Sequence, residues 1–328
     1  MTQPTNLFDR YDGSTAVRES LSDVIYNISP EETPFMSNVG KGTAKQTYNE
    51  WQTDALAAAS TSNAVIEGDD SALEARTPTV RQGNYTQISK KVIGVSGTVE
   101  AVDKAGIKSY MAYEMAKAGS ELKTDMESIL LHRQIGVAGD SSTARKTAGL
   151  PNWITNNTNL ATTGTAGVDA VFSGGGTSGY PSTDRVEGTQ RAFTEVILKD
   201  VVSQMWTAGA KIKMLMVGPF NKQAASAFAG LADARFNVSS SRSLAIIATA
   251  DVYLSDFGEL SIVPNRFQRE RDGLFLDPEF IKVDYLRDFR TEDLAKTGDS
   301  TKKQMLVEYS LCVKNEKALG LAADLTAS

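Results

Sequence analysis

The chain has 328 residues, of which 41% are hydrophobic and 23% are charged. These proportions are ordinary for a globular protein and exclude collagen, a coiled-coil rod and a wholly disordered chain. Its 34 Lys and Arg residues are outnumbered by 40 Asp and Glu residues, which gives a net charge of −6. A broad basic surface that grips nucleic acid is therefore not expected.

The residue types that most often carry chemistry are scarce, because the chain contains one cysteine, Cys312, and one histidine, His132. A disulfide framework within the chain is impossible, and zinc sites of the finger or ribbon type lack ligands. The first residues lack the basic and apolar regions of a signal peptide, and no apolar stretch is long enough to span a membrane. We therefore expect a soluble protein, made in a reducing cytoplasm, without metal ion or cofactor.

The first 45 residues predict an extended arm. A helix is expected over residues 18–28, and a capping box follows at residues 29–32. The apolar side chains of this helix recur at helical spacing, namely Leu21, Ile25 and Ile28. Such short elements bury too little surface to fold alone, so the arm needs another surface on which to lie.

Two strand-like segments, residues 43–54 and 77–102, flank a stretch rich in Ala, Ser, Thr and Asn. Their alternation of apolar and polar residues, clearest between residues 93 and 101, predicts one long projecting hairpin. Two arms of about 20 residues would each reach about 60 Å. Because an isolated two-stranded ribbon is only marginally stable in water, the hairpin is expected to lie on another molecule.

Residues 109–134 give the strongest helical signal in the chain. The apolar stripe consists of Met111, Met115, Ala118, Leu122, Met126 and Ile129, which is the spacing of one helix face. A helix of this length would extend about 39 Å. It is therefore expected to form the spine of a domain.

Residues 155–190 are dense in Asn, Thr, Ser and Gly, which is typical of a surface loop. Short helices and strands follow. Helices are expected at residues 191–208 and 221–231, and strands at residues 212–217, 252–254, 260–263, 274–276, 281–286 and 305–313. Cys312 falls in the last strand and is interpreted as a packed, unreactive thiol.

Each motif that could carry chemistry has a simpler structural interpretation. Residues 40–43 (GKGT) lack the glycine that a phosphate-binding loop places five residues before its Gly-Lys pair, so they predict a turn. The glycines at 174–176 predict a flexible loop, and the charges at 69–70 and 269–272 predict solvated turns. His132 lies near the end of the long helix, where a cation favours the helix dipole, and a catalytic role is not expected.

The order of the elements is an arm, a long hairpin, a spine helix, and a mixed α/β region with a returning strand. This order resembles the major capsid protein of tailed bacteriophages, with the Hong Kong 97-type fold that encapsulin shells share. Two stretches resemble more narrowly the branch typified by the capsid protein of phage SU10. They are DVIYNISPEETPF at 23–35 with EWQTD at 50–54, and LAKTGD at 294–299 with EYSL at 308–311 and NEKALG at 315–320. The resemblance extends from residue 18 to residue 325, except for the loop at 155–190.

The resemblance implies an α+β fold with named parts. The N-terminal arm would be residues 1–45, the extended β-hairpin loop 46–104, the peripheral domain 105–150 with the spine helix at 109–134, and the axial domain 151–277. Strands at 278–316 would complete the peripheral domain, and residues 317–328 would return to the axial domain. The candidate inter-subunit contacts are Phe35, Tyr48, Trp51, Asp69, Asp70 and Tyr85.

The resemblance also implies a function, namely self-assembly into an icosahedral head shell of hexamers and pentamers. The shell would enclose double-stranded DNA and retain it mechanically, without sequence-specific binding. Scaffolding, portal and decoration proteins are further candidate partners. Assembly would take place in the bacterial host cytoplasm, and the product would be part of the virion.

Other functions stay open at this point. An encapsulin-like compartment would use a similar shell to hold a cargo enzyme, and a tail or fibre component would form trimers or needles. A hydrolase would have to use His132 with an unassigned Ser and Asp. We expect no enzyme and assign no catalytic, cofactor-binding or metal-binding residue.

Overall fold

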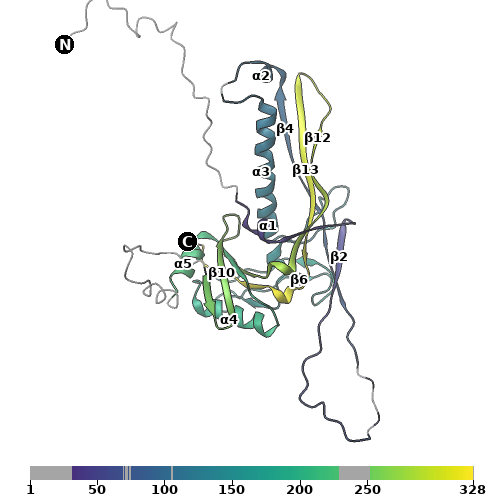
Figure 1. Cartoon of the computed structure of the whole chain (residues 1–328), viewed down its shortest axis with the longest axis vertical. Helices are drawn as coiled ribbons and strands as arrows, with labels where there is room; N and C mark the ends of the chain where they lie inside the picture. Colours follow the sequence, from purple (N-terminus) through teal and green to yellow (C-terminus); the bar gives the residue numbers. More distant parts are fainter. Residues whose placement is uncertain are drawn as a thin grey trace, which may run out of the picture.

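The computed structural model describes residues 32–68, 70, 73, 75–104, 106–228 and 252–327. The helix expected at residues 18–28 and most of the capping box that follows it lie outside the described residues. Figure 1 shows a tall upper lobe, a lower body, and a loop that projects from the foot of the molecule.

The described helices are α1 (Pro34–Asn38), α2 (Gly97–Ala101), α3 (Tyr110–Leu131), α4 (Glu195–Thr207) and α5 (Pro219–Ser226), with short 3-10 turns η1 (Leu150–Asn152), η3 (Pro278–Phe280) and η4 (Glu316–Ala318). The strands are β1 (Gly40–Thr43), β2 (Tyr48–Thr53), β3 (Val80–Tyr85), β4 (Gln87–Ser96), β5 (Thr158–Asn159), β6 (Val171–Phe172), β7 (Pro181–Thr183), β8 (Met214–Val217), β9 (Val252–Ser255), β10 (Gly258–Pro264), β11 (Gly273–Leu276), β12 (Ile281–Asp293), β13 (Ser300–Val313) and β14 (Gly320–Ala322).

The upper lobe combines α3 with a four-stranded sheet of order β1-β12-β13-β4 (Figure 1). The strands β12, β13 and β4 are antiparallel neighbours, and β1 runs parallel to β12. The hydroxyl of Ser109 caps α3 by accepting a hydrogen bond from the Ala112 N–H. The helix expected at 109–134 is confirmed, with its observed end at Leu131.

Only the base of the expected hairpin is paired. β2 and β3 pair over six residues, from Tyr48 with Tyr85 to Thr53 with Val80. Beyond Thr86 the chain leaves the hairpin, because β4 pairs with β13 instead, and the alternation expected to reach residue 101 gives way to α2. The prediction of a ribbon with two long arms is wrong, since a period of two identifies a strand but not its partner.

The lower body contains a six-stranded sheet of order β5-β14-β11-β8-β10-β9. Its central strands β8 and β11 have the sequences MLMV and GLFL and are buried at every residue. Such unbroken apolar runs are typical of strands that are covered on both faces. β14, near the end of the chain, pairs with β11 and β5 and thereby fixes the C-terminal segment to this sheet.

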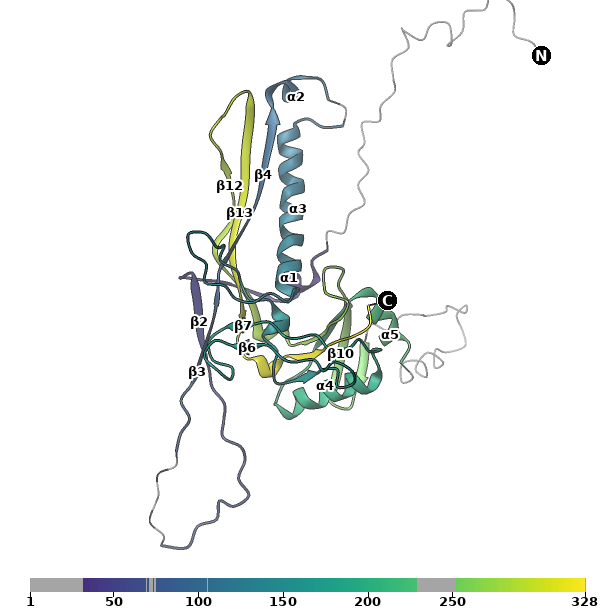
Figure 2. The ribbon, with the colours of Figure 1, turned by 180° about the vertical axis from the view of Figure 1, so that it is seen from behind.

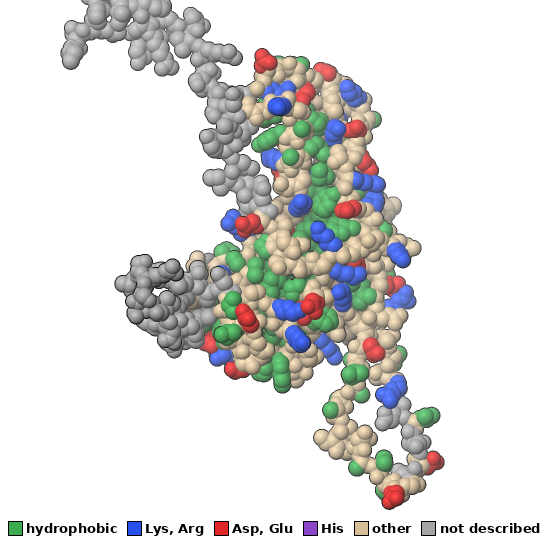
Figure 3. Space-filling view, viewed as in Figure 1, with side chains coloured by type: hydrophobic (Ala, Val, Ile, Leu, Met, Phe, Trp, Pro, Cys, Tyr) green, Lys and Arg blue, Asp and Glu red, His purple; other side chains and the backbone are tan. Residues whose placement is uncertain are grey.

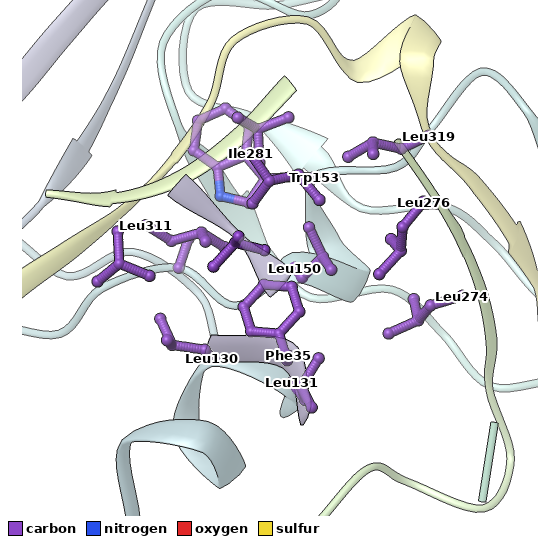
Figure 4. Packing of buried hydrophobic residues seen from close by; sticks show 14 of the residues in the cluster. Phe35, Leu130, Leu131, Leu150, Trp153, Leu274, Leu276, Ile281, Leu311 and Leu319 are labelled. Carbon is purple, nitrogen blue, oxygen red and sulfur yellow. The ribbon is translucent and has the colours of Figure 1, made fainter. Parts of the chain in front are cut away.

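One hydrophobic cluster joins the lobe to the body (Figure 4). Phe35 of α1 lies among Leu130 and Leu131 of α3, and Trp153 lies close to Ile281 of β12. A second cluster fills the space between α4 and the six-stranded sheet. Because the first cluster takes side chains from both sheets, the lobe and the body share a core.

Two elements begin differently from their predictions. Residues 40–43 form the strand β1 and not a turn, and a Cβ at Gly42 would collide with the Asp284 carboxylate of β12. The helix expected from residue 191 begins at Glu195, because Arg191 forms a bridge to Leu325 and its guanidinium donates to the Asn159 carbonyl.

Candidate assembly surface

The loop between β2 and β3, residues 54–79, projects from the foot of the molecule (Figure 1). Four of its apolar side chains are almost completely exposed: Leu56 (99%), Val65 (80%), Ile66 (81%) and Leu73 (102%). Figure 3 shows such hydrophobic side chains standing separately on the loop, with acidic ones at its far end. Single exposed apolar side chains are common on protein surfaces, so it is the combination of four of them with a segment that projects from the body that makes this loop a candidate contact for another molecule.

Aromatic rings hold the base of this loop. Tyr48 of β2 and Tyr85 of β3 stack with ring centroids 4.7 Å apart, and Tyr180 meets both rings edge-on. Trp51 stacks on the buried Trp153 at 5.4 Å. Burial, followed by the nearby Glu50 carboxylate, raises the pKa of Tyr48 to about 12. The two ends of the projecting loop therefore leave the body beside packed aromatic rings, among which the Tyr48 hydroxyl stays protonated.

The turn between β6 and β7 lies against β3 and extends the support of the loop (Figure 2). The N–H of Gly179 donates to the Arg81 carbonyl at 2.9 Å, and the N–H of Gly83 donates to the Gly179 carbonyl at 2.9 Å. A Cβ at Gly83 would lie 2.7 Å from the Tyr48 ring, so only glycine fits there. The Gln82 amide donates to the Thr177 carbonyl at 2.8 Å.

Glu127 of α3 fixes the point where the arm enters the fold. Its carboxylate accepts hydrogen bonds from the N–H groups of Phe35 (2.7 Å) and Met36 (2.9 Å) and from the side-chain amide of Asn265 (2.7 Å). Burial raises the pKa of Glu127, and these three bonds act in the opposite direction. Phe35 is completely buried within its own chain, so the prediction that it contacts another subunit is wrong.

A buried ionic network ties three distant segments together. The Arg185 guanidinium lies 3.1 Å from Asp272 and 3.9 Å from Asp324, and all three side chains are at most 2% exposed. Asp324 also accepts from the N–H groups of Gly188 (2.8 Å) and Ala161 (3.1 Å). The expectation of solvated charges at 269–272 is therefore wrong for Asp272, whose partner lies 87 positions away in the sequence.

The other predicted contact residues have distinct environments. Tyr48, Trp51 and Tyr85 are half-buried at the base of the loop. Asp70 is exposed in the loop between β2 and β3, and Asp69 lies outside the described residues. The structure thus stacks Tyr48 on Tyr85, stacks Trp51 on Trp153, and leaves Asp70 in the loop between β2 and β3.

A comparison with known families shows to which family the chain belongs. A model of the SU10 major capsid protein family matches residues 3–326. The chain belongs to this family. One curated relative, the major capsid protein of Escherichia phage Phieco32, is 29% identical in sequence to this chain. The match covers 98% of this chain and 97% of the relative.

Solved structures agree with this family at the level of the fold. The capsid of cyanophage A-1(L) is 13% identical with a TM-score of 0.66, and 97% of this chain and 100% of that chain are covered. The SrpI encapsulin of Synechococcus elongatus is 11% identical with a TM-score of 0.57, with 98% and 97% covered. The predicted α+β fold of the Hong Kong 97 type is confirmed.

The rare residue types of this capsid-family chain have structural positions. His132 is exposed at the C-terminal cap of α3, and its imidazole has no hydrogen bond or ion pair within the described residues. Cys312 is buried in β13, and burial raises the pKa of its thiol to about 12. In the part of the chain that the structure describes, no cluster of His, Cys, Asp and Glu could hold a metal ion.

No described helix is long and apolar enough to cross a membrane.

Sequence reasoning missed Glu127, Arg185 and Tyr180. A glutamate next to the apolar stripe of a strongly predicted helix was the one available signal for Glu127, because a buried helix face rarely carries a carboxylate without a partner. Arg185 and Tyr180 stand in a loop whose composition indicated only solvent exposure. Nothing local distinguishes them from surface residues.

Proposed function

We propose that this chain is the major capsid protein of a bacteriophage and forms the shell of the head. The observation that carries this conclusion is the family match over residues 3–326, which covers nearly the whole chain. The fold agrees, and a structural subunit has no need of the reactive groups that this sequence lacks.

The subunits are inferred to form hexamers and pentamers that close into an icosahedral shell. The loop at 54–79 supports this inference, because its exposed apolar side chains lie outside the core of their own chain. A loop that reaches from one subunit onto the next makes heterologous contacts, and such contacts generate closed rings when the rotation closes. Copies of this chain are therefore the principal partners.

The two sheets support the proposed capsid domains. We infer that the four-stranded sheet with α3 forms the peripheral domain and that the six-stranded sheet with α4 and α5 forms the axial domain. β14 supports the proposed return of residues 317–328 to the axial domain. The loop region proposed at 46–104 is better divided after Thr86, because β4 is a strand of the peripheral sheet.

Individual contacts follow from the same arrangement. Asp70, which is exposed in the loop, is inferred to contact a neighbouring subunit, and the same contact is proposed for Asp69, which lies outside the described residues. The half-exposed surfaces of Tyr48, Trp51 and Tyr85 form a second contact at its base, and tyrosine and tryptophan are enriched at the centres of protein interfaces.

The packaged double-stranded DNA is inferred to be held by closure of the shell. The net charge of −6 supports this view, because a strongly basic wall would bind the phosphates. Assembly in the bacterial cytoplasm, with scaffolding, portal and decoration proteins as further partners, completes the proposal. The mature protein is part of the virion.

Electron microscopy of the purified chain in negative stain tests the assembly. Spherical shells with sixfold and fivefold capsomers are expected, and uniform monomers under all assembly conditions would contradict the proposal. The variant His132→Ala should assemble normally, since the exposed His132 side chain has no hydrogen bond among the residues that the structure describes. A catalytic activity that this variant abolishes would favour the hydrolase instead.

An encapsulin-like compartment is the second candidate, favoured by the TM-score of 0.57 to an encapsulin. At 11% identity this likeness shows the fold alone, whereas the family match is specific to phage capsid proteins. The content of natively purified particles separates the two candidates. Genomic DNA is expected, and a single cargo enzyme in DNA-free particles would favour the compartment.

A further inference from the structure

The strand β9 forms an outer edge of the six-stranded sheet in the part of the chain that the structure describes. It pairs with β10 on one side, from Val252 with Ser261 to Ser255 with Gly258, and it is the last strand in the order of the sheet. An edge strand presents backbone N–H and C=O groups to any extended chain that lies alongside it. The sequence of β9, VYLS, contains neither the proline nor the charged residue that often blocks such an edge, and its pairing with β10 has no bulge.

A groove lies beside this edge, between β9 and α4, and its volume is about 530 Å3. One side is lined by Glu195, Lys199, Val202 and Ser203 of α4, and the other side by residues 252–257. The four residues of α4 recur at i, i+4, i+7 and i+8, so they form one stripe of the helix. The helix α4 and the strand β10, which is the neighbour of β9, lie side by side in the lower body (Figures 1 and 2). A strand added to β9 would therefore have side chains of α4 beside it.

Apolar side chains are exposed along the groove and at one end of it. In β9, Leu254 is 78% exposed, and Val252 is exposed on the same face of the strand. Phe257, in the turn after β9, stacks on the exposed Trp206 of α4 with ring centroids 5.1 Å apart. Aromatic residues are enriched at the centres of protein interfaces. Their position beside an unpaired strand distinguishes these side chains from apolar residues scattered singly over a surface.

The charges at the groove are mainly negative. Glu195 and Asp256 line it, and Glu259, the cross-strand neighbour of Leu254, is exposed beside it. Among the described residues that line the groove, Lys199 is the one cation, and its ammonium pairs with the Glu195 carboxylate at 2.8 Å. A partner that carries Lys or Arg therefore complements the groove, whereas an acidic partner does not.

We propose that this groove binds an extended segment of another protein, which joins the sheet as a further strand beside β9 and carries apolar side chains together with Lys or Arg. The backbone of β9 holds the segment, the groove and the aromatic pair receive its apolar side chains, and the carboxylates select its charge. This inference concerns the single subunit and does not depend on the shell-forming function proposed above.

Binding of synthetic peptides to the purified full-length chain tests the proposal. The probe is a fluorescein-labelled peptide of alternating valine and lysine, and fluorescence anisotropy measures its binding. Methylation of its backbone nitrogens removes the donors needed for strand pairing and should weaken binding at least about tenfold. Replacement of its lysines by glutamate should also weaken binding at least about tenfold. Equal binding of the three peptides would overturn the proposal.

Two matched variants locate the site on the chain. Leu254→Lys removes an apolar contact and places a positive charge beside the bound segment, so it should weaken binding of the valine–lysine peptide at least about tenfold. Val196→Lys adds the same charge to α4 at a side chain that is 76% exposed and does not line the groove. This control should change the affinity less than about twofold. Because both positions are exposed, both variants should unfold at the same urea concentration as the wild type.

Three outcomes would overturn the proposal. An equal loss of affinity in the two variants would show that the peptide binds elsewhere. A wild-type chain that binds no peptide would show that the groove is already filled. Dimers that form without peptide and that Leu254→Lys dissociates would assign the groove to a second copy of the chain.

Discussion

Two segments of similar composition behave differently in this molecule. The loop at 54–79 and the region at 155–190 are both rich in Ser, Thr, Ala and other small residues. The first projects into solvent with its apolar side chains exposed, whereas the second packs on the body through buried Phe172 and Arg185. A few anchoring side chains, and not the average composition, decide whether such a segment belongs to the subunit or extends beyond it.

The partners of these anchors explain the difference. Phe172 meets Trp153 edge-on with ring centroids 5.4 Å apart, and Arg185 lies between the carboxylates of Asp272 and Asp324. These partners come from distant parts of the chain. The loop at 54–79 presents its apolar residues to the outside, so their partners are expected on another subunit.

The variant Arg185→Leu should have the largest effect on the anchored region. It removes the buried cation that the carboxylates of Asp272 and Asp324 share and leaves each with one partly exposed arginine, Arg269 at 3.1 Å and Arg271 at 3.6 Å, so the loss should be about 3 kcal/mol. Urea unfolding monitored by circular dichroism measures this loss. Arg81→Leu is the matched control, because the Arg81 side chain is 68% exposed and pairs with Glu50 at the surface. Its effect should stay within about 0.5 kcal/mol; equal effects of the two variants would refute the network as an anchor.

The variant Phe172→Ala should be the next most damaging. Removing a buried aromatic ring typically costs about 3–5 kcal/mol. The variant would leave a cavity beside Trp153, and because β6 is short the chain can partly fill this cavity, which lowers the loss. The neighbouring Val171 is 54% exposed, so Val171→Ala should change the free energy of unfolding by less than about 0.5 kcal/mol. The same urea titration tests both variants, and a stable Phe172→Ala protein would show that the region is not held by this ring.

The smallest expected effect concerns pH and the base of the projecting loop. The pKa of Tyr48 is raised from 10.0 to about 12, so its neutral form favours the folded state. This contribution is complete below about pH 10 and is lost as the pH rises through about 12. Tyr48→Phe should therefore lose less stability than the wild type between these pH values. Urea midpoints that fall in parallel for both proteins would contradict this role of Tyr48.

Elements with strong local periodicity were predictable from the sequence. The helix α3 was expected at 109–134 and is observed at Tyr110–Leu131, and the strand expected at 305–313 is the buried end of β13. The fold class followed from the resemblance to a capsid family that the order of such elements and the quoted stretches carry. Their local signals are strong because each has one side packed against the core along most of its length.

Pairing over long distances was not predictable in the same way. β4 has the alternation of a hairpin strand, yet its partner β13 lies more than 200 residues away. Phe35 stands in an arm and gives no local sign that Glu127 and α3 would bury it. The charges at 269–272 indicate solvent exposure until Arg185 is placed beside them. In each case the environment is set by a contact that no local window contains.

Deletion of residues 57–73 tests most directly whether the projecting loop serves neighbouring subunits. The deletion spares β2, β3 and the aromatic base, so the truncated chain should fold, remain soluble and unfold at the same urea concentration as the wild type. Electron microscopy should show wild-type shells but only isolated subunits or capsomers for the deletion. Closed shells of normal size from the truncated chain would contradict the proposed bridge between subunits.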